Sequence, residues 1–139
     1  MSEDKWHIRY LRLAREIASW SKDPKKKVGC VLTDEYNRIV STGMNGPPAH
    51  VDLTDFDDED RLAITIHAEV NALLQKNRDF VTAYVWPVMP CSQCMAALVQ
   101  AGVQRVVSVD TPSPKWRWDL SVKICERRSV ELLICQILQ

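Results

Sequence analysis

Apolar side chains recur at intervals of three and four residues between positions 5 and 21. The stripe is made of Trp6, Tyr10, Leu13, Ile17 and Trp20, with Leu11, Ala14 and Ala18 beside it. This spacing puts the side chains on one face of a helix, so the segment is predicted to be an amphipathic helix. Asp23-Pro24 should end it, because the residue before a proline avoids helical geometry.

Short apolar runs and further helical patterns alternate over the rest of the chain. Strands are predicted at residues 28–33, 38–42, 82–88, 105–109 and 130–134, and helices at 67–76, 91–101 and 118–127. Residues 43–48 have the composition of a loop, and the four Asp and one Glu of residues 55–60 indicate a solvated loop or the acidic start of a helix. Helices that alternate with short strands predict an α/β sandwich around a partly parallel sheet.

The composition narrows the class of protein. A length of 139 residues with 46% hydrophobic residues fits one globular domain over residues 1–139. The 18 basic and 18 acidic residues balance, which gives no support for binding a long nucleic acid. No apolar run approaches the ~20 residues of a membrane span, and the polar start Met1–Lys5 is unlike a leader peptide. We therefore expect a soluble cytoplasmic domain.

Five cysteines, an odd number, argue against a disulfide scaffold. Cys91 and Cys94 follow a predicted strand and open a helix in the motif Pro90-Cys-Ser-Gln-Cys. Their spacing puts both sulfurs on one face of the first turn, where the helix N-terminus lowers the pKa of a thiol. His67-Ala68-Glu69 begins the preceding helix, so both helix starts should meet at one end of the sheet, where α/β proteins bind ligands.

His-x-Glu followed by Pro-Cys-x-x-Cys is the signature of zinc-dependent nucleobase deaminases. His67, Cys91 and Cys94 would supply three ligands, and a catalytic zinc keeps its fourth position for a water whose pKa falls to about 7. Glu69 would move protons from this water to the ring nitrogen and the departing amine. A redox dithiol is the alternative for the cysteine pair, and the upstream His-x-Glu favours the metal site. The remaining cysteines, Cys30, Cys125 and Cys135, are expected in the core. Of the remaining histidines, His7 is expected on the surface, and His50 is expected either on the surface or at the pocket.

Three further motifs extend the pattern: Ser21-Lys22-Asp23-Pro24, Gly43-Met44-Asn45-Gly46, and residues 101–107. With them the chain resembles the cytidine/deoxycytidylate deaminase superfamily from Trp6 to about Leu133, and the dCMP deaminase branch most closely. The resemblance implies a three-layer α/β/α sandwich around a five-stranded mixed sheet. It also implies a homo-oligomer, in many relatives a hexamer, and regulation by dCTP and dTTP.

The same resemblance implies a reaction and the residues that perform it. The expected reaction is hydrolytic deamination of dCMP to dUMP and ammonia, which supplies thymidylate synthesis. The zinc ion would be bound by His67, Cys91 and Cys94, with Glu69 as the proton shuttle. Asn45 would bind the sugar, and the backbone N–H of Ala68 would bind the pyrimidine.

Departures from the family pattern leave the substrate open, and they argue against regulation by dCTP and dTTP. Met44, Ala49 and His50 replace the Tyr, Arg and Gly that are frequent in the family loop. Alternatives are therefore another cytosine nucleotide or nucleoside, a modified cytidylate or another aminated heterocycle. A non-catalytic, zinc-stabilised subunit of a deaminase assembly is a further alternative, against which the intact Glu69 argues.

A nucleotide substrate also needs a partner for its phosphate. The loop that should border the site contains four lysines, Lys22, Lys25, Lys26 and Lys27, and each is a candidate phosphate ligand. Lys22 and Lys27 are selected as the predicted pair, with Arg117 as an alternative. Trp116 would stack on the base or close the pocket, unless it packs against a neighbouring subunit.

Overall fold

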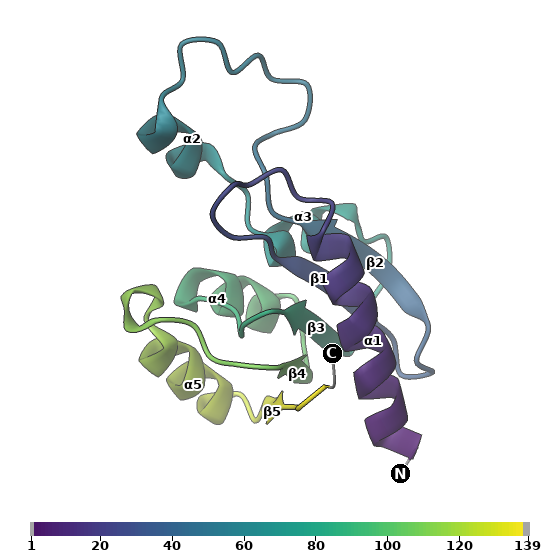
Figure 1. Ribbon diagram of the computed structural model, residues 1–139. Coiled ribbons are helices and arrows are strands. Elements are labelled where there is room, and N and C mark those ends of the chain that lie inside the picture. Colours follow the sequence, from purple (N-terminus) through teal and green to yellow (C-terminus); the bar gives the residue numbers. More distant parts are fainter. Residues whose placement is uncertain (1, 138–139) are drawn as a thin grey trace.

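The computed structural model describes residues 2–137, which form a five-stranded sheet in the order β2-β1-β3-β4-β5 (Figure 1). The strands are β1 Gly29–Thr33, β2 Ile39–Met44, β3 Thr82–Trp86, β4 Arg105–Ser108 and β5 Glu131–Ile134. β1 runs antiparallel to both β2 and β3, whereas β3, β4 and β5 are parallel to one another. The prediction of a mixed, partly parallel sheet is confirmed.

Helices cover both faces of this sheet. Helix α1, Ser2–Ala18, lies on one face, and α3 (Ala68–Gln75), α4 (Ser92–Gln100) and α5 (Trp118–Arg127) cover the other (Figure 1). Helix α2, Asp58–Ile64, stands away from the sheet, and a short 3-10 turn, η1, spans Pro114–Trp116. The three-layer α/β/α sandwich is therefore confirmed. None of the helices between residues 2 and 137 is both long and apolar enough to cross a membrane.

The strand register divides the core into two layers. Val31, Tyr84 and Val107 are neighbours across β1, β3 and β4, and they pack against the apolar face of α1. Because side chains alternate along a strand, Cys30 and Val85 point to the opposite face and join the core beneath α3 and α4. Both faces of the central strands are covered, which explains the continuous apolar runs in the sequence.

Helix α1 buries most of the predicted apolar face, with His7 added to it. Its buried residues are His7, Tyr10, Leu11, Ala14, Ile17 and Ala18. His7 precedes Tyr10 and Leu11 by about one helical turn, and its Nδ1 lies 3.0 Å from the hydroxyl oxygen of Tyr84, so the prediction of a surface histidine is wrong. Trp20 is 56% exposed. The helix ends at Ala18, earlier than the predicted Asp23-Pro24, because the N–H groups of Trp20 and Ser21 bond to carbonyls three residues back instead of four.

Gly43 belongs to a strand, although its neighbourhood has the composition of a loop. β2 runs through Met44, and Gly43 pairs with Cys30. A Cβ atom on Gly43 would lie 2.5 Å from the carbonyl oxygen of Ala68 and 2.5 Å from the amide nitrogen of Ala72. The glycine is therefore needed because α3 lies directly against the strand.

Replacing Gly43 with alanine should destabilise the fold by about 1–3 kcal/mol, the range for overpacked cores. The added methyl group would push against the α3 backbone, which cannot yield as a flexible side chain would. The midpoint and slope of urea unfolding measure the effect. Gly46→Ala is the matched control, because its Cβ would meet nothing within 4 Å. Equal stability of the two variants would contradict this account of the packing.

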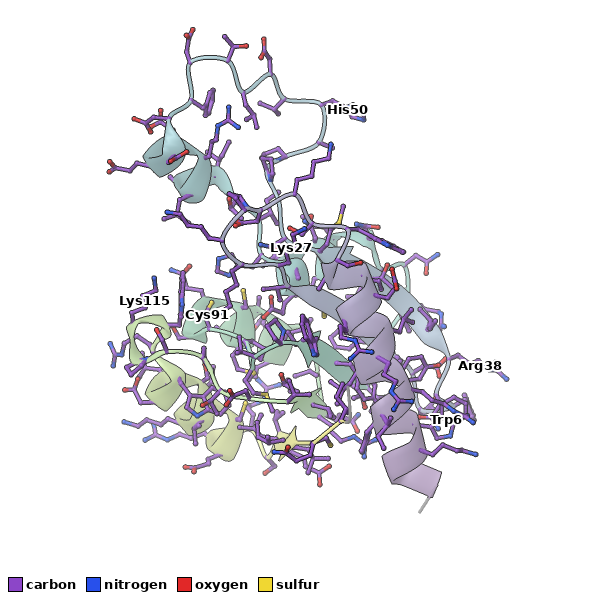
Figure 2. The ribbon with its side chains drawn as sticks, viewed as in Figure 1. Trp6, Lys27, Arg38, His50, Cys91 and Lys115 are labelled. Atoms are coloured by element: carbon purple, nitrogen blue, oxygen red, sulfur yellow. The ribbon has the colours of Figure 1, made fainter. Side chains whose placement is uncertain are left out.

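Residues 47–65 form an arm that stands off the body of the molecule and carries α2 (Figure 1). The Asp57 side chain accepts a hydrogen bond from the Asp60 N–H at 2.8 Å, and the Asp60 side chain accepts one from the Asp57 N–H at 3.3 Å. This capping box makes the acidic segment the start of a helix. His50 lies on the arm, exposed and well separated from Cys91 (Figure 2).

Candidate active site

Two helix N-termini meet at one end of the sheet. His67 directly precedes α3, and Cys91 directly precedes α4; both have extended backbones, and neither side chain caps its helix. Cys94 lies one turn further along α4. His67 Nδ1 is 3.2 Å from Cys94 Sγ and 3.6 Å from Cys91 Sγ, and the three donor atoms all lie within 4.8 Å of one another. The fold thus brings together the three side chains that the sequence singled out.

The geometry of this cluster fits a zinc ion. Tetrahedral zinc with Zn–S bonds of about 2.3 Å and Zn–N bonds of about 2.0–2.1 Å would place nitrogen and sulfur about 3.5 Å apart. The two observed distances, 3.2 and 3.6 Å, lie on either side of this value. Two sulfurs and one imidazole are also donors that zinc prefers. Three protein ligands leave one position open, as in catalytic zinc sites.

Charge in the cluster is concentrated on one sulfur. A hydrogen bond from the Cys94 thiol and a weaker contribution from a hydrogen bond with His67 together lower the pKa of Cys91 to about 4, although burial acts in the opposite direction. The hydrogen bond from the Cys94 thiol, together with burial, raises the pKa of Cys94. The hydrogen bond with Cys91 raises the pKa of His67. Cys91 is therefore a thiolate at neutral pH, which is the form that binds metals.

Glu69 lies in the first turn of α3 and is only 4% exposed. It lines a pocket together with His67 and Cys91. Burial raises the pKa of its carboxyl group to about 7, although the nearby His67 and Lys26 act in the opposite direction. A carboxyl group with a pKa near the working pH can both take up and release a proton. Glu69 is thus suited to acid–base chemistry.

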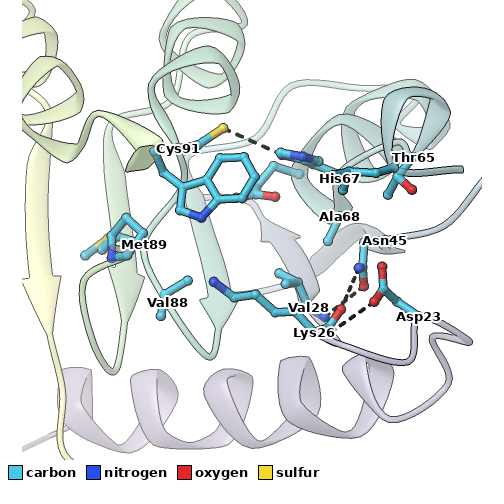
Figure 3. A pocket seen from close by; sticks show the side chains of 14 residues that line it. Asp23, Lys26, Val28, Asn45, Thr65, His67, Ala68, Val88, Met89 and Cys91 are labelled. Carbon is cyan, nitrogen blue, oxygen red and sulfur yellow. Dashed lines mark hydrogen bonds between the residues drawn. The ribbon is translucent and has the colours of Figure 1, made fainter. Parts of the chain in front are cut away.

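The pocket in front of these residues has a volume of about 100 Å³ and is built from both halves of the chain (Figure 3). The predicted substrate contacts Asn45, Ala68 and Trp116 all line it. The ring of Trp116 meets the imidazole of His67 edge-on, with centroids 5.7 Å apart and an angle of 79°. Leu62 and Thr65 line the pocket from the arm, and no sequence motif singled out either of them.

Asn45 has a structural role that its motif did not predict. Its Oδ1 accepts a hydrogen bond from the Val28 N–H, and its Nδ2 donates to the carbonyl oxygen of Lys26, each at 2.8 Å (Figure 3). The side chain therefore ties the end of β2 to the loop before β1. An amide has a second N–H and further lone pairs, so it can also bind a ligand in the pocket.

The structure separates the lysines that the sequence treated together. Lys26 lines the pocket, whereas Lys22 and Lys27 are not among its lining residues, although all three are exposed. The alternative Arg117 bonds to Asp119, with 3.0 Å between Nη2 and Oδ2. Lys26 is one of the four lysines considered from the sequence, but it is not one of the two selected. Asp23 could have pointed to Lys26, because Asp is a typical turn-forming residue. Its side chain accepts a hydrogen bond from the Lys26 N–H and so determines the shape of this loop.

Comparison with known proteins supports the reading of this site. A model of the cytidine and deoxycytidylate deaminase zinc-binding region matches residues 4–110. The chain belongs to the cytidine and deoxycytidylate deaminase family. It is accordingly a hydrolytic deaminase, and the matched region includes His67, Glu69, Cys91 and Cys94.

Individual relatives agree with this assignment. An uncharacterized deaminase of Aliivibrio fischeri is 37% identical, over 88% of this chain and 85% of that protein. A probable deoxycytidylate deaminase of Caenorhabditis elegans is 40% identical, over 73% of this chain but only 56% of that protein. The crystal structure of a dCMP deaminase from cyanophage S-TIM5 has the same fold, with a TM-score of 0.74 at 20% identity over 94% of this chain and 98% of the phage chain.

Proposed function

We propose that this deaminase converts dCMP and water to dUMP and ammonia, and that residues 1–139 form a single catalytic domain. The observation that carries the proposal is the cluster of His67, Cys91 and Cys94 beside the buried Glu69 at the base of one pocket. The names of the Caenorhabditis elegans relative and the cyanophage neighbour support the substrate. The buried, pocket-lining Glu69 favours an active enzyme over a non-catalytic subunit.

His67, Cys91 and Cys94 would hold the zinc ion in this proposal. When bound, the ion supplies Lewis acidity that lowers the pKa of water to about 7. Glu69 accepts a proton from the attacking water and donates it to ring nitrogen N3. It then carries the proton of the new hydroxyl group to the exocyclic amine, which leaves as ammonia. A carboxyl pKa of about 7 suits both transfers.

The remaining residues of the pocket would orient the substrate. Ala68 begins α3, and the first N–H groups of a helix have no partner within it, so the Ala68 N–H can donate to the pyrimidine carbonyl. Asn45 would contact the sugar. Trp116 would cover the base, held in place by its edge-on contact with His67.

The test is a substrate screen with the purified, zinc-loaded protein. Ammonia release is measured with cytidine, deoxycytidine, CMP, dCMP, dCTP and cytosine. We expect the highest kcat/KM for dCMP, at least about tenfold above deoxycytidine, since a charge-assisted hydrogen bond is worth about 1.5–3 kcal/mol. Equal rates on dCMP and deoxycytidine would contradict the mononucleotide assignment, and the best substrate of the panel would replace it.

A further inference from the structure

Lys26 differs from the other lysines of its loop in the location of its side chain. It is the lysine of the run 22–27 that lines the catalytic pocket. In Figure 3 the side chain extends across the pocket toward Val88 on the opposite wall. A positive group therefore lines the same pocket as the carboxyl group of Glu69.

The backbone of Lys26 is fixed on both sides. Its N–H donates to Asp23 Oδ1 at 3.0 Å, and the same oxygen accepts the Lys25 N–H at 2.8 Å. Its carbonyl oxygen accepts a hydrogen bond from Asn45 Nδ2 at 2.8 Å. Because the main chain is held at both peptide groups, the side chain is presented to the pocket from a fixed point. A preorganised cation binds an anion at a smaller entropic cost than one on a flexible loop.

Lys26 forms no ion pair with a carboxylate among the described residues 2–137. Lys26 also lines a second cavity, together with Arg15, Lys25 and Lys27 among others. The side of the catalytic pocket at Lys26 therefore borders a strongly basic surface. Such a positive region attracts an anionic group.

The order of these residues matches the order of groups in a nucleotide. His67 and Glu69 stand where the base would react, and Asn45 would contact the sugar. Asn45 is bonded directly to the carbonyl oxygen of Lys26, so the sugar-binding and cationic residues are adjacent. A 5′-phosphate is attached to the sugar and must lie next to it. We propose that Lys26 binds this phosphate and is the residue that selects nucleotides over nucleosides, an inference that rests on the proposed function.

Lys26→Ala should lower kcat/KM for dCMP at least about tenfold and leave kcat/KM for deoxycytidine nearly unchanged. Lys26→Arg should keep most of the dCMP preference, whereas Lys26→Gln should lose it, because the contact requires a positive charge. Lys25→Ala is the matched control: this exposed lysine of the same loop lines only the second cavity. We expect Lys25→Ala to keep the wild-type ratio of kcat/KM for dCMP to kcat/KM for deoxycytidine.

The test of this inference is to measure ammonia release from dCMP and from deoxycytidine for the wild type and these variants. A dCMP preference that survives Lys26→Ala would overturn the inference while leaving the proposed function intact. A preference lost instead in the double variant Lys22→Ala/Lys27→Ala would assign the phosphate to those lysines and equally overturn it. A wild type that does not distinguish the two substrates would overturn the proposed function, and the role of Lys26 with it.

Discussion

Replacing Glu69 with glutamine is expected to lower kcat by about two to four orders of magnitude while the protein stays folded and keeps its zinc. Glutamine has nearly the same size and polarity as glutamate, but it cannot accept or release a proton at neutral pH. Because Glu69 lines the pocket and is 4% exposed, solvent has little room to replace it as a proton carrier. Ammonia release gives the rate, and zinc per chain by mass spectrometry gives the metal content.

Glu126→Gln is the matched control for this experiment, because Glu126 is an exposed residue of α5 outside the pocket. It should retain wild-type activity. A Glu69→Gln protein that has lost its zinc in full would show that the carboxylate binds the metal. A fully active Glu69→Gln protein would remove the proton shuttle from the mechanism.

Cys94→Ser should release the zinc and lower the melting temperature. Cys94 is 2% exposed, and its sulfur is 3.2 Å from His67 Nδ1, so it occupies a ligand position with no room for a substitute. A serine hydroxyl group stays protonated at neutral pH and binds zinc poorly compared with a thiolate. Since a bound metal stabilises the folded state, its loss should also appear in thermal unfolding with and without added zinc.

Cys125→Ser separates loss of metal from damage to the core. Cys125 is also a buried cysteine, but it lies on α5 away from the cluster. The variant should be destabilised, because a hydroxyl group is buried in an apolar layer, and yet keep about one zinc per chain. Full zinc content in Cys94→Ser, or equal zinc loss in both variants, would refute the proposed ligand set.

Features set by local sequence could be predicted. Helix α5 was expected at 118–127 and spans those residues, because its apolar period is undisturbed by proline or glycine. The cluster of His67, Cys91 and Cys94 was equally accessible, since these residues stand at the starts of two helices whose positions follow from the pattern. Because Cys91 and Cys94 are three residues apart at the start of a helix, their side chains lie on the same face of it, independently of contacts with other elements.

Features set by distant contacts could not be predicted. Which lysine reaches the pocket depends on Asn45, which bonds to the Lys26 carbonyl oxygen from the far end of β2. Gly43 looked like a loop residue because the sequence does not reveal that α3 would lie against it. His7 is buried because Tyr84, on a strand much later in the chain, offers its hydroxyl group. In each case the deciding partner comes from another element.

One wall of the pocket is formed by the arm, residues 47–65, which is less tightly packed than the helices that form the other wall. Helix α2 buries none of its residues, and Leu62, which lines the pocket, is 67% exposed. Two backbone hydrogen bonds between Gly46 and Ile66, of 3.0 and 2.7 Å, close the base of the arm. Segments with so few buried contacts exchange their amide hydrogens through small local fluctuations, while packed helices exchange only through much larger ones. We therefore expect amide hydrogens of the arm to exchange faster than those of α3 and α4, and the pocket to widen at Leu62 and Thr65 without a change in the spacing of His67, Cys91 and Cys94.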